Sequence, residues 1–123
     1  MEREEFEKVT QDVFDALPER FHNAIENVHI VVEDYPDNNV TQQTGFHPGG
    51  LLLGLYEGIP LNRRGVHYGT WPIVPDKITL FRRNIERIAR SDAEVREAIR
   101  ETLIHEIGHY FGMSEQEIRN AGY

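Results

Sequence analysis

The chain has 123 residues, with 13 lysines and arginines against 21 aspartates and glutamates, for a formal net charge of −8. This length predicts one domain spanning residues 1–123, and the acidic balance disfavours nucleic acid as a partner. The sequence contains no cysteine, which excludes disulfides, thiolate metal sites and a cysteine nucleophile. No apolar run approaches about 18 residues and no signal-peptide pattern follows Met1. We therefore expect a soluble, cytoplasmic protein without a membrane partner.

The first third of the chain predicts two helices followed by a strand. Apolar residues recur at helical spacing over residues 2–16, and this helix should end before Pro18 because a residue that precedes proline is disfavoured in the α region. Residues 19–27 indicate a second, short helix. The β-branched run at residues 28–33 predicts a strand.

Two long segments rich in turn-forming residues separate three predicted strands. Residues 35–50 and 60–75 contain most of the prolines and several glycines, and loops of this length usually carry a function. Strands are predicted over residues 51–56 and 77–82. Gly54 lies inside the first of these strands, where a glycine indicates a bulge or a close backbone approach.

The last third of the chain predicts a long helix and a short one. Ser91 and Glu94 have the spacing of a capping box, which marks the start of a helix over about residues 92–111. Gly112 is expected to end that helix. A last short helix follows over residues 115–120.

The order of these elements defines the expected fold class. Helices come first, strands follow, and helices end the chain, with a short helix over residues 85–89 directly after the third strand. This order predicts an α+β fold with a small mixed or antiparallel sheet of about three strands.

The pattern His105-Glu106-x-x-His109 is the most informative feature of the sequence. Residues four apart lie on the same side of a helix, with Cβ atoms about 6 Å apart, so both imidazoles can bind one zinc ion at about 2.0–2.1 Å. Glu106 lies about 100° around the helix, where its carboxylate can act as a general base on a water.

The rest of this predicted helix argues against a core role for the two histidines, because its apolar side lies nearly opposite them. That apolar side comprises Ile99, Leu103, Ile107, Tyr110 and Phe111. The alternative interpretation is a pair of solvated histidines without a function.

The segment after the helix supplies candidates for a third metal ligand. A chain that turns back after Gly112 can bring the side chain three residues later, Glu115, to the metal, as in extended forms of the motif. A carboxylate oxygen is an acceptable zinc ligand at about 2.0–2.2 Å, although Glu115 can equally interact with the dipole of the last helix. Glu117 is the substitute candidate, and His47 and His67 in the predicted loops are further alternatives.

The sequence resembles the minimal zincin-like metallopeptidase family, small bacterial proteins with a minimal matrix-metalloprotease-like domain. The resemblance covers nearly the whole chain and is carried by residues 17–19, 27–34, 52–56, 59–61, 78–82 and 105–112. It implies a minimal zincin-like fold, in which a small sheet packs on the active-site helix and one zinc ion is bound. The family usually has an acidic residue at the position of Glu115, which favours that residue as the third ligand.

Motif and resemblance together predict a zinc-dependent metallopeptidase that hydrolyses a peptide or protein substrate. The predicted zinc ligands are His105, His109 and Glu115, and Glu106 is the predicted catalytic base. One alternative is a catalytically silent zinc-binding relative that acts as a protein-interaction module, and another is a non-proteolytic zinc amidohydrolase. Residues 78–82 are interpreted either as an edge strand that aligns an extended substrate or as an ordinary strand covered by a loop. The oligomeric state is left open.

Overall fold

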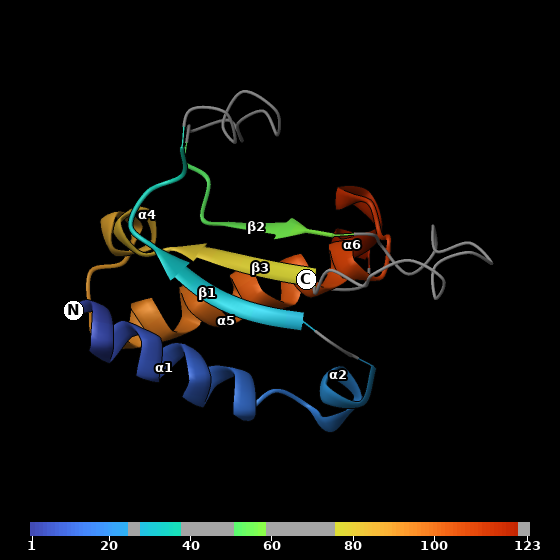
Figure 1. The fold of residues 1–123 in the computed structure, drawn as a ribbon, viewed down its shortest axis with the longest axis horizontal. Helices are drawn as coiled ribbons and strands as arrows, with labels where there is room; N and C mark the ends of the chain where they lie inside the picture. Colours follow the sequence, from blue (N-terminus) through green and yellow to red (C-terminus); the bar gives the residue numbers. More distant parts are fainter. Residues whose placement is uncertain (25–27, 38–50, 59–75, 121–123) are drawn as a thin grey trace.

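Figure 1 shows the fold in a computed structural model, which describes residues 1–24, 28–37, 51–58 and 76–120. Most of the two predicted loops, residues 35–50 and 60–75, lies outside these ranges. The predicted α+β fold class is confirmed. In chain order the elements are α1 (Arg3–Asp15), α2 (Glu19–Ala24), β1 (Val28–Glu33), β2 (Gly54–Glu57), β3 (Asp76–Phe81), α4 (Arg82–Ile88), α5 (Asp92–Tyr110) and α6 (Glu115–Asn120).

The strands form a mixed sheet in the order β1–β3–β2. β1 runs parallel to β3, with Val28 opposite Asp76. β2 runs antiparallel to β3, with Gly54 opposite Leu80. The sheet therefore joins strands that are far apart in the sequence, and β3, the last of them, lies between the other two.

The central position of β3 shows that the interpretation of residues 78–82 as an edge strand is wrong. Because β3 has a paired strand on each side, neither of its backbone edges is open to an extended peptide. Ile78, Thr79, Leu80 and Phe81 are all buried, as expected for a strand covered on both faces. Within the described part of the chain, the edges of the sheet are β1 and β2.

α5 and α1 pack against one face of the sheet, and the hydrophobic core lies between these layers (Figure 1). Fully buried side chains come from each layer: Phe6 from α1, Ile78 and Leu80 from β3, and Ile99 and Leu103 from α5. Burial of an aliphatic or aromatic side chain of this size contributes about 1.5–3 kcal/mol. This core therefore fixes the position of α5 relative to the sheet.

Both ends of α5 are defined by residues that the sequence predicts. Ser91 Oγ accepts a hydrogen bond from Glu94 N at 3.2 Å, which caps the first turn. The Glu94 carboxylate accepts from Arg90 N at 2.9 Å. Gly112 has a φ of 82°, a left-handed conformation that glycine adopts at little cost, and the helix ends just before it.

Several predicted boundaries differ from the structure by one to three residues, and the helix predicted over residues 85–89 is α4, which spans Arg82–Ile88. β2 begins at Gly54 and not at Leu51, and the carbonyl of Leu52 accepts a hydrogen bond from the Asn84 side chain at 2.8 Å in place of a strand partner. Arg82, expected at the end of the third strand, is the first residue of α4. Both boundaries coincide with side-chain contacts between distant residues, which no local pattern encodes.

Arg82 is a buried cation that links α4 to the end of β1. Its Nε donates to Asp34 Oδ1 at 3.0 Å, and its Nη1 donates to Glu86 Oε1 at 3.4 Å. The hydrogen bond from Arg82, opposed in part by desolvation, lowers the pKa of Asp34 below its ordinary value. A carboxyl group with a lowered pKa in the folded state stabilises the fold above its unfolded pKa of about 3.9, and this contribution is lost as the pH falls through the folded value.

We therefore expect Asp34→Asn to be less stable than the wild type at pH 7, with a difference that shrinks as the pH falls below about 4. Urea unfolding at pH 7 and at pH 3 measures this difference. Asp12→Asn, a change on α1 away from Arg82, is the matched control. A deficit of the Asp34 variant that stays constant or grows in acid would contradict the assignment.

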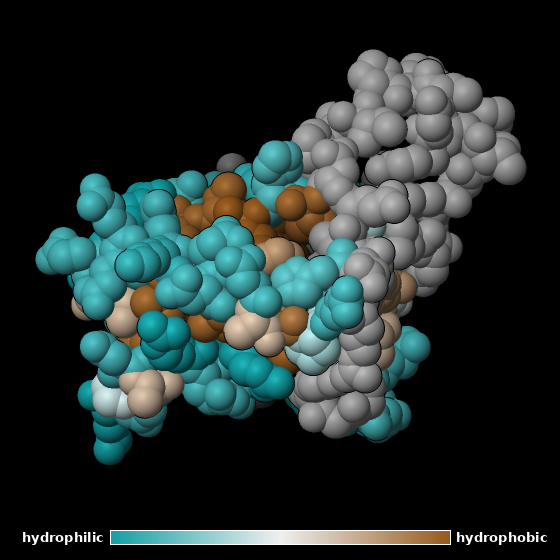
Figure 2. Space-filling model, turned by 90° about the horizontal axis from the view of Figure 1, so that it is seen from below, coloured by the Kyte–Doolittle hydropathy of each residue, from teal (hydrophilic) through white to brown (hydrophobic). Residues whose placement is uncertain are grey.

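The surface on the side of α1 is mainly hydrophilic (Figure 2). In that view hydrophilic residues cover most of the described part of the face, with small hydrophobic areas between them. α1 has the apolar side that the sequence predicts for this helix, because Phe6 and Val9 are buried while Glu4 and Glu5 are exposed. In the part of the chain that the structure describes, no helix has both the length and the apolar character needed to cross a membrane.

Candidate metal centre

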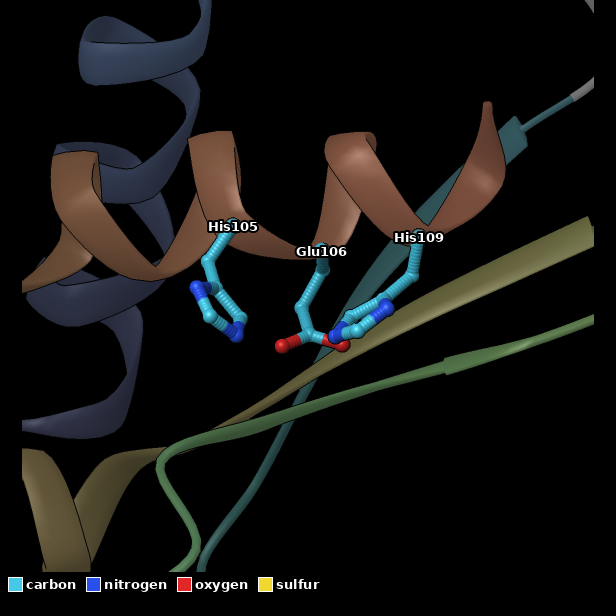
Figure 3. A group of neighbouring side chains, drawn as sticks. All are labelled: His105, Glu106 and His109. Carbon is cyan, nitrogen blue, oxygen red and sulfur yellow. The ribbon is translucent and has the colours of Figure 1, made fainter. Parts of the chain in front are cut away.

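α5 brings three of the predicted site residues together. In Figure 3 the side chains of His105, Glu106 and His109 project from neighbouring turns of the helix toward the strands of the sheet. The spacing of four residues places the two histidines one turn apart on the same side. Their ring centroids are 5.0 Å apart and their ring planes are inclined by 78°.

The donor atoms of these three residues lie close enough to share one metal ion. One ligand atom from each of His105, Glu106 and His109 lies within 4.8 Å of the others, and the ligands of a tetrahedral zinc ion are roughly 3–4 Å apart. Imidazole nitrogens and carboxylate oxygens are donors that zinc accepts. Among the described residues this is the one group of its kind, and its chemistry fits zinc.

The burial of the three residues differs. His105 and His109 are half-buried, so their rings are neither sealed in the core nor fully solvated. Glu106 is only 7% exposed, and a buried carboxylate requires hydrogen-bond donors. One donor is the backbone N–H of Tyr56 in β2, which lies 2.9 Å from Glu106 Oε1.

β2 and α5 are in direct contact at Gly54. A Cβ atom built on Gly54 would lie 2.5 Å from Thr102 Cγ2 and 3.4 Å from Glu106 Cγ. Thr102 therefore occupies the space that any side chain at position 54 would need. The close backbone approach predicted for Gly54 is confirmed.

α6 is fixed against the last turns of α5. A Cβ atom at Gly108 would lie 2.8 Å from Ile118 Cγ1 and Cδ1, and Ile118 is buried. The turn between the helices is closed by hydrogen bonds from Met113 N to Gly108 O at 3.0 Å and from Gly112 N to His109 O at 2.9 Å. The absence of a side chain at Gly108 thus allows Ile118 of α6 to pack closely against α5.

The candidates for the third ligand have different positions. Glu115 is the first residue of α6, and its side chain lies outside the described part of the structure, as do His47 and His67. Glu117 and Ser114 form a reciprocal capping box, in which Ser114 N donates to Glu117 Oε1 at 3.1 Å and Glu117 N donates to Ser114 Oγ at 3.2 Å. This structural role accounts for Glu117 without a metal.

A cavity of about 600 Å³ adjoins His105 and Glu106. It is lined by Leu51, Leu52 and Leu53, by Ile88, and by the side of α5 between residues 98 and 106. Ile88 is 49% exposed, so its apolar side chain faces the solvent as well as the cavity. The cavity offers a mainly apolar space beside the candidate centre, and its volume falls in the range of ligand-binding sites.

Two parts of this site are not predicted from the sequence. The first is the amide of Tyr56, because a backbone donor leaves no pattern in the residue types. The second is the cavity, for which the run of three leucines at residues 51–53 was the available signal. The glycine at position 54 was the one local indication that this segment contacts another element.

A helix that carries two histidines and a glutamate with HExxH spacing, packed on one face of a small mixed sheet, defines a protein of the zincin metallopeptidase class. The chain belongs to the zincin-like metallopeptidase family, whose sequence profile matches residues 25–123. The resemblance stated from the sequence is confirmed by this match, which includes the whole of α5 and α6.

The fold is also similar to that of a solved structure, which is described as a conserved hypothetical protein from Thermo thermophilus. The two chains are 20% identical, 98% of each is covered, and the TM-score is 0.57. At this identity the similarity concerns the fold alone. A search among curated proteins found no match.

Proposed function

We propose that this protein is a zinc-dependent metallopeptidase that hydrolyses peptide bonds in a peptide or protein substrate of the cytoplasm. The observation that carries the proposal is the group formed by His105, Glu106 and His109, whose donor atoms lie within 4.8 Å of one another. Membership of the zincin-like family supports it.

The three side chains have separate roles in this proposal. His105 and His109 hold the zinc ion, which when bound lowers the pKa of a water and polarises the scissile carbonyl. Glu106 accepts a proton from the attacking water and passes it to the leaving amine. The buried position of Glu106 supports this role, because electrostatic interactions are stronger where water is excluded.

In this proposal the substrate lies along the outer edge of β2, because β2 and α5 are themselves in direct contact at Gly54. An extended peptide can pair only with an edge strand, and β2 is the edge strand that contacts α5 in the described part of the chain. The cavity beside His105 then accommodates a side chain of the substrate, for which its leucine lining favours an apolar group.

Metal analysis together with a hydrolysis assay tests the proposed function. We expect the wild type to retain one zinc ion per chain and to cleave an unstructured protein such as casein. His109→Ala should lose both properties, because it removes one of the two zinc ligands on α5. His29→Ala, a matched change at an exposed histidine of β1, should retain both. Zinc content unaffected by His109→Ala would refute the centre, and stoichiometric zinc without any hydrolysis would refute the peptidase.

We further propose Glu115 as the third zinc ligand. Loss of a residue that contacts only a metal ligand lowers metal affinity by roughly 10–100-fold. Because Glu115→Ala removes a ligand itself, we expect it to lower zinc affinity by more than this, as measured by competition with a zinc chelator. Glu117→Ala is the matched control, because its carboxylate caps α6 and its loss should lower stability with little effect on zinc affinity. Equal zinc affinities of the two variants would exclude Glu115 as the ligand.

A further inference from the structure

β2 contacts the candidate general base with its backbone. Tyr56 N donates to Glu106 Oε1 at 2.9 Å, so this N–H points away from β3 and toward α5. In an antiparallel pair, residues alternate between those that bond the partner strand and those that point outward. Tyr56 is an outward-pointing residue of an edge strand, and its amide contacts the enzyme's own carboxylate.

The distance between β2 and α5 is set by side-chain size at two positions. Gly54 lies two residues before Tyr56, and Thr102 lies one helical turn before Glu106. A Cβ atom at Gly54 would be 2.5 Å from Thr102 Cγ2 and 3.2 Å from the carbonyl oxygen of Thr79. A larger residue at position 54 must therefore displace Thr102 or move the strand away from the helix, and movement of the strand takes the Tyr56 amide away from Glu106.

The side chain of Tyr56 fixes the strand at the same point. Its hydroxyl donates to Asp76 Oδ2 at 3.1 Å, and Asp76 is buried. Its ring packs edge-on against Tyr110 of α5, with centroids 5.9 Å apart. Tyr56 is thus anchored to both β3 and α5.

We propose that β2 positions the general base: the backbone amide of Tyr56 holds the Glu106 carboxylate in its working orientation, and Gly54 sets the strand–helix distance that this hydrogen bond requires. Tyr56 and Gly54 are positioning residues. A carboxylate offers about four lone-pair sites, so a donor on Oε1 is compatible with proton transfer to the group. Fixing a catalytic group in its reactive orientation removes part of the barrier to reaction. The catalytic part of this inference rests on the proposed function.

Amide hydrogen exchange tests the contact without any hydrolysis assay. In Glu106→Ala we expect the exchange of the Tyr56 amide to accelerate by about tenfold or more, because a charge-assisted hydrogen bond is lost. Glu106→Gln retains an acceptor oxygen and should stay closer to the wild type. The Phe81 amide, which donates to Leu53 O at 2.9 Å, is the internal control for general loosening of the sheet. Unchanged Tyr56 exchange in Glu106→Ala would overturn the proposal.

A pair of variants isolates the amide in catalysis. Tyr56→Ala and Tyr56→Pro both remove the phenol, but only proline removes the N–H, and proline is tolerated at the outward positions of edge strands. With zinc content and KM similar in both, we expect kcat of the proline variant to be about tenfold lower than that of the alanine variant. Equal kcat values would show that the amide does not position the base.

If proline at position 56 disrupts β2, a second pair of variants tests the distance between β2 and α5. Gly54→Ala should lower kcat at unchanged zinc content, and the additional change Thr102→Ser should restore part of it. Serine lacks the Cγ2 atom that the new Cβ would meet but retains the hydroxyl that donates to Ala98 O at 2.7 Å. Thr102→Ser alone is the control for the effect of serine at position 102 on kcat. A kcat unaffected by Gly54→Ala, or a double variant no better than the single one, would contradict the role of Gly54. If the wild type shows no hydrolysis at all, the proposed function fails while the exchange experiment still decides the contact.

Discussion

Replacing Glu106 by glutamine is expected to lower kcat for peptide hydrolysis by about 10²–10⁴-fold while the protein still takes up zinc. Glutamine has nearly the same shape as glutamate but cannot take a proton from water at neutral pH. Its amide oxygen can still accept the hydrogen bond that Tyr56 N donates, so the contact with β2 is preserved. Measuring kcat and zinc content on the same preparation separates loss of the base from loss of the metal.

The matched control for this experiment is Glu97→Gln, which makes the same chemical change at an exposed position of α5. It should leave kcat and zinc content unchanged. A Glu106→Gln protein that hydrolyses peptides at the wild-type rate would contradict the role of the base. A variant that loses zinc would instead indicate that the Glu106 carboxylate serves as a ligand.

Helices and strands follow the sequence closely where local signals are strong. The β-branched run at residues 28–33 is a strand with those bounds, and Ser91 begins α5 through the hydrogen bond that the capping pattern predicts. These features depend on residues within one or two turns of each other. The order of strands depends on pairing between β1, β2 and β3 across long stretches of chain, and for this reason the sequence left open whether β3 is an edge strand.

The site shows the same division between local and distant contacts. The positions of His105 and His109 follow from helical periodicity alone, which a sequence displays directly. The surroundings of Glu106 do not, because the amide that binds its carboxylate belongs to residue 56, fifty positions earlier in the chain. A glycine at position 54 indicates that something approaches closely, but only the fold identifies the partner as Thr102.

α5 is buried on more sides than its apolar pattern predicts. The pattern places one apolar side opposite the histidines, and Ile99, Leu103 and Ile107 are indeed fully buried. The helix is also covered by β2 at Thr102 and by α6 at Gly108, and neither residue is strongly hydrophobic. Small and polar side chains permit close approach at these contacts, so a hydrophobicity pattern underestimates how firmly the helix is held.

Substituting Leu103 by alanine is expected to lower the free energy of unfolding by about 2–5 kcal/mol, the range for truncating a fully buried leucine. Leu103 has no exposed surface and belongs to the core cluster formed by α1, β3 and α5. Alanine is the best helix former, so the loss comes from the cavity and not from the helix itself. Urea unfolding in the presence of a chelator measures the effect without the additional stability that a bound metal confers.

The control for this prediction is Glu97→Ala, an alanine substitution at an exposed position of α5, which should change the free energy of unfolding by no more than about 0.5 kcal/mol. Because His105 and His109 lie on a different side of the helix from Leu103, folded Leu103→Ala protein should still bind one zinc ion per chain. A loss below about 1 kcal/mol would contradict the packing of α5 against the core. Loss of zinc binding by the folded variant would mean that the core sets the geometry of the two imidazoles more tightly than helical spacing alone requires.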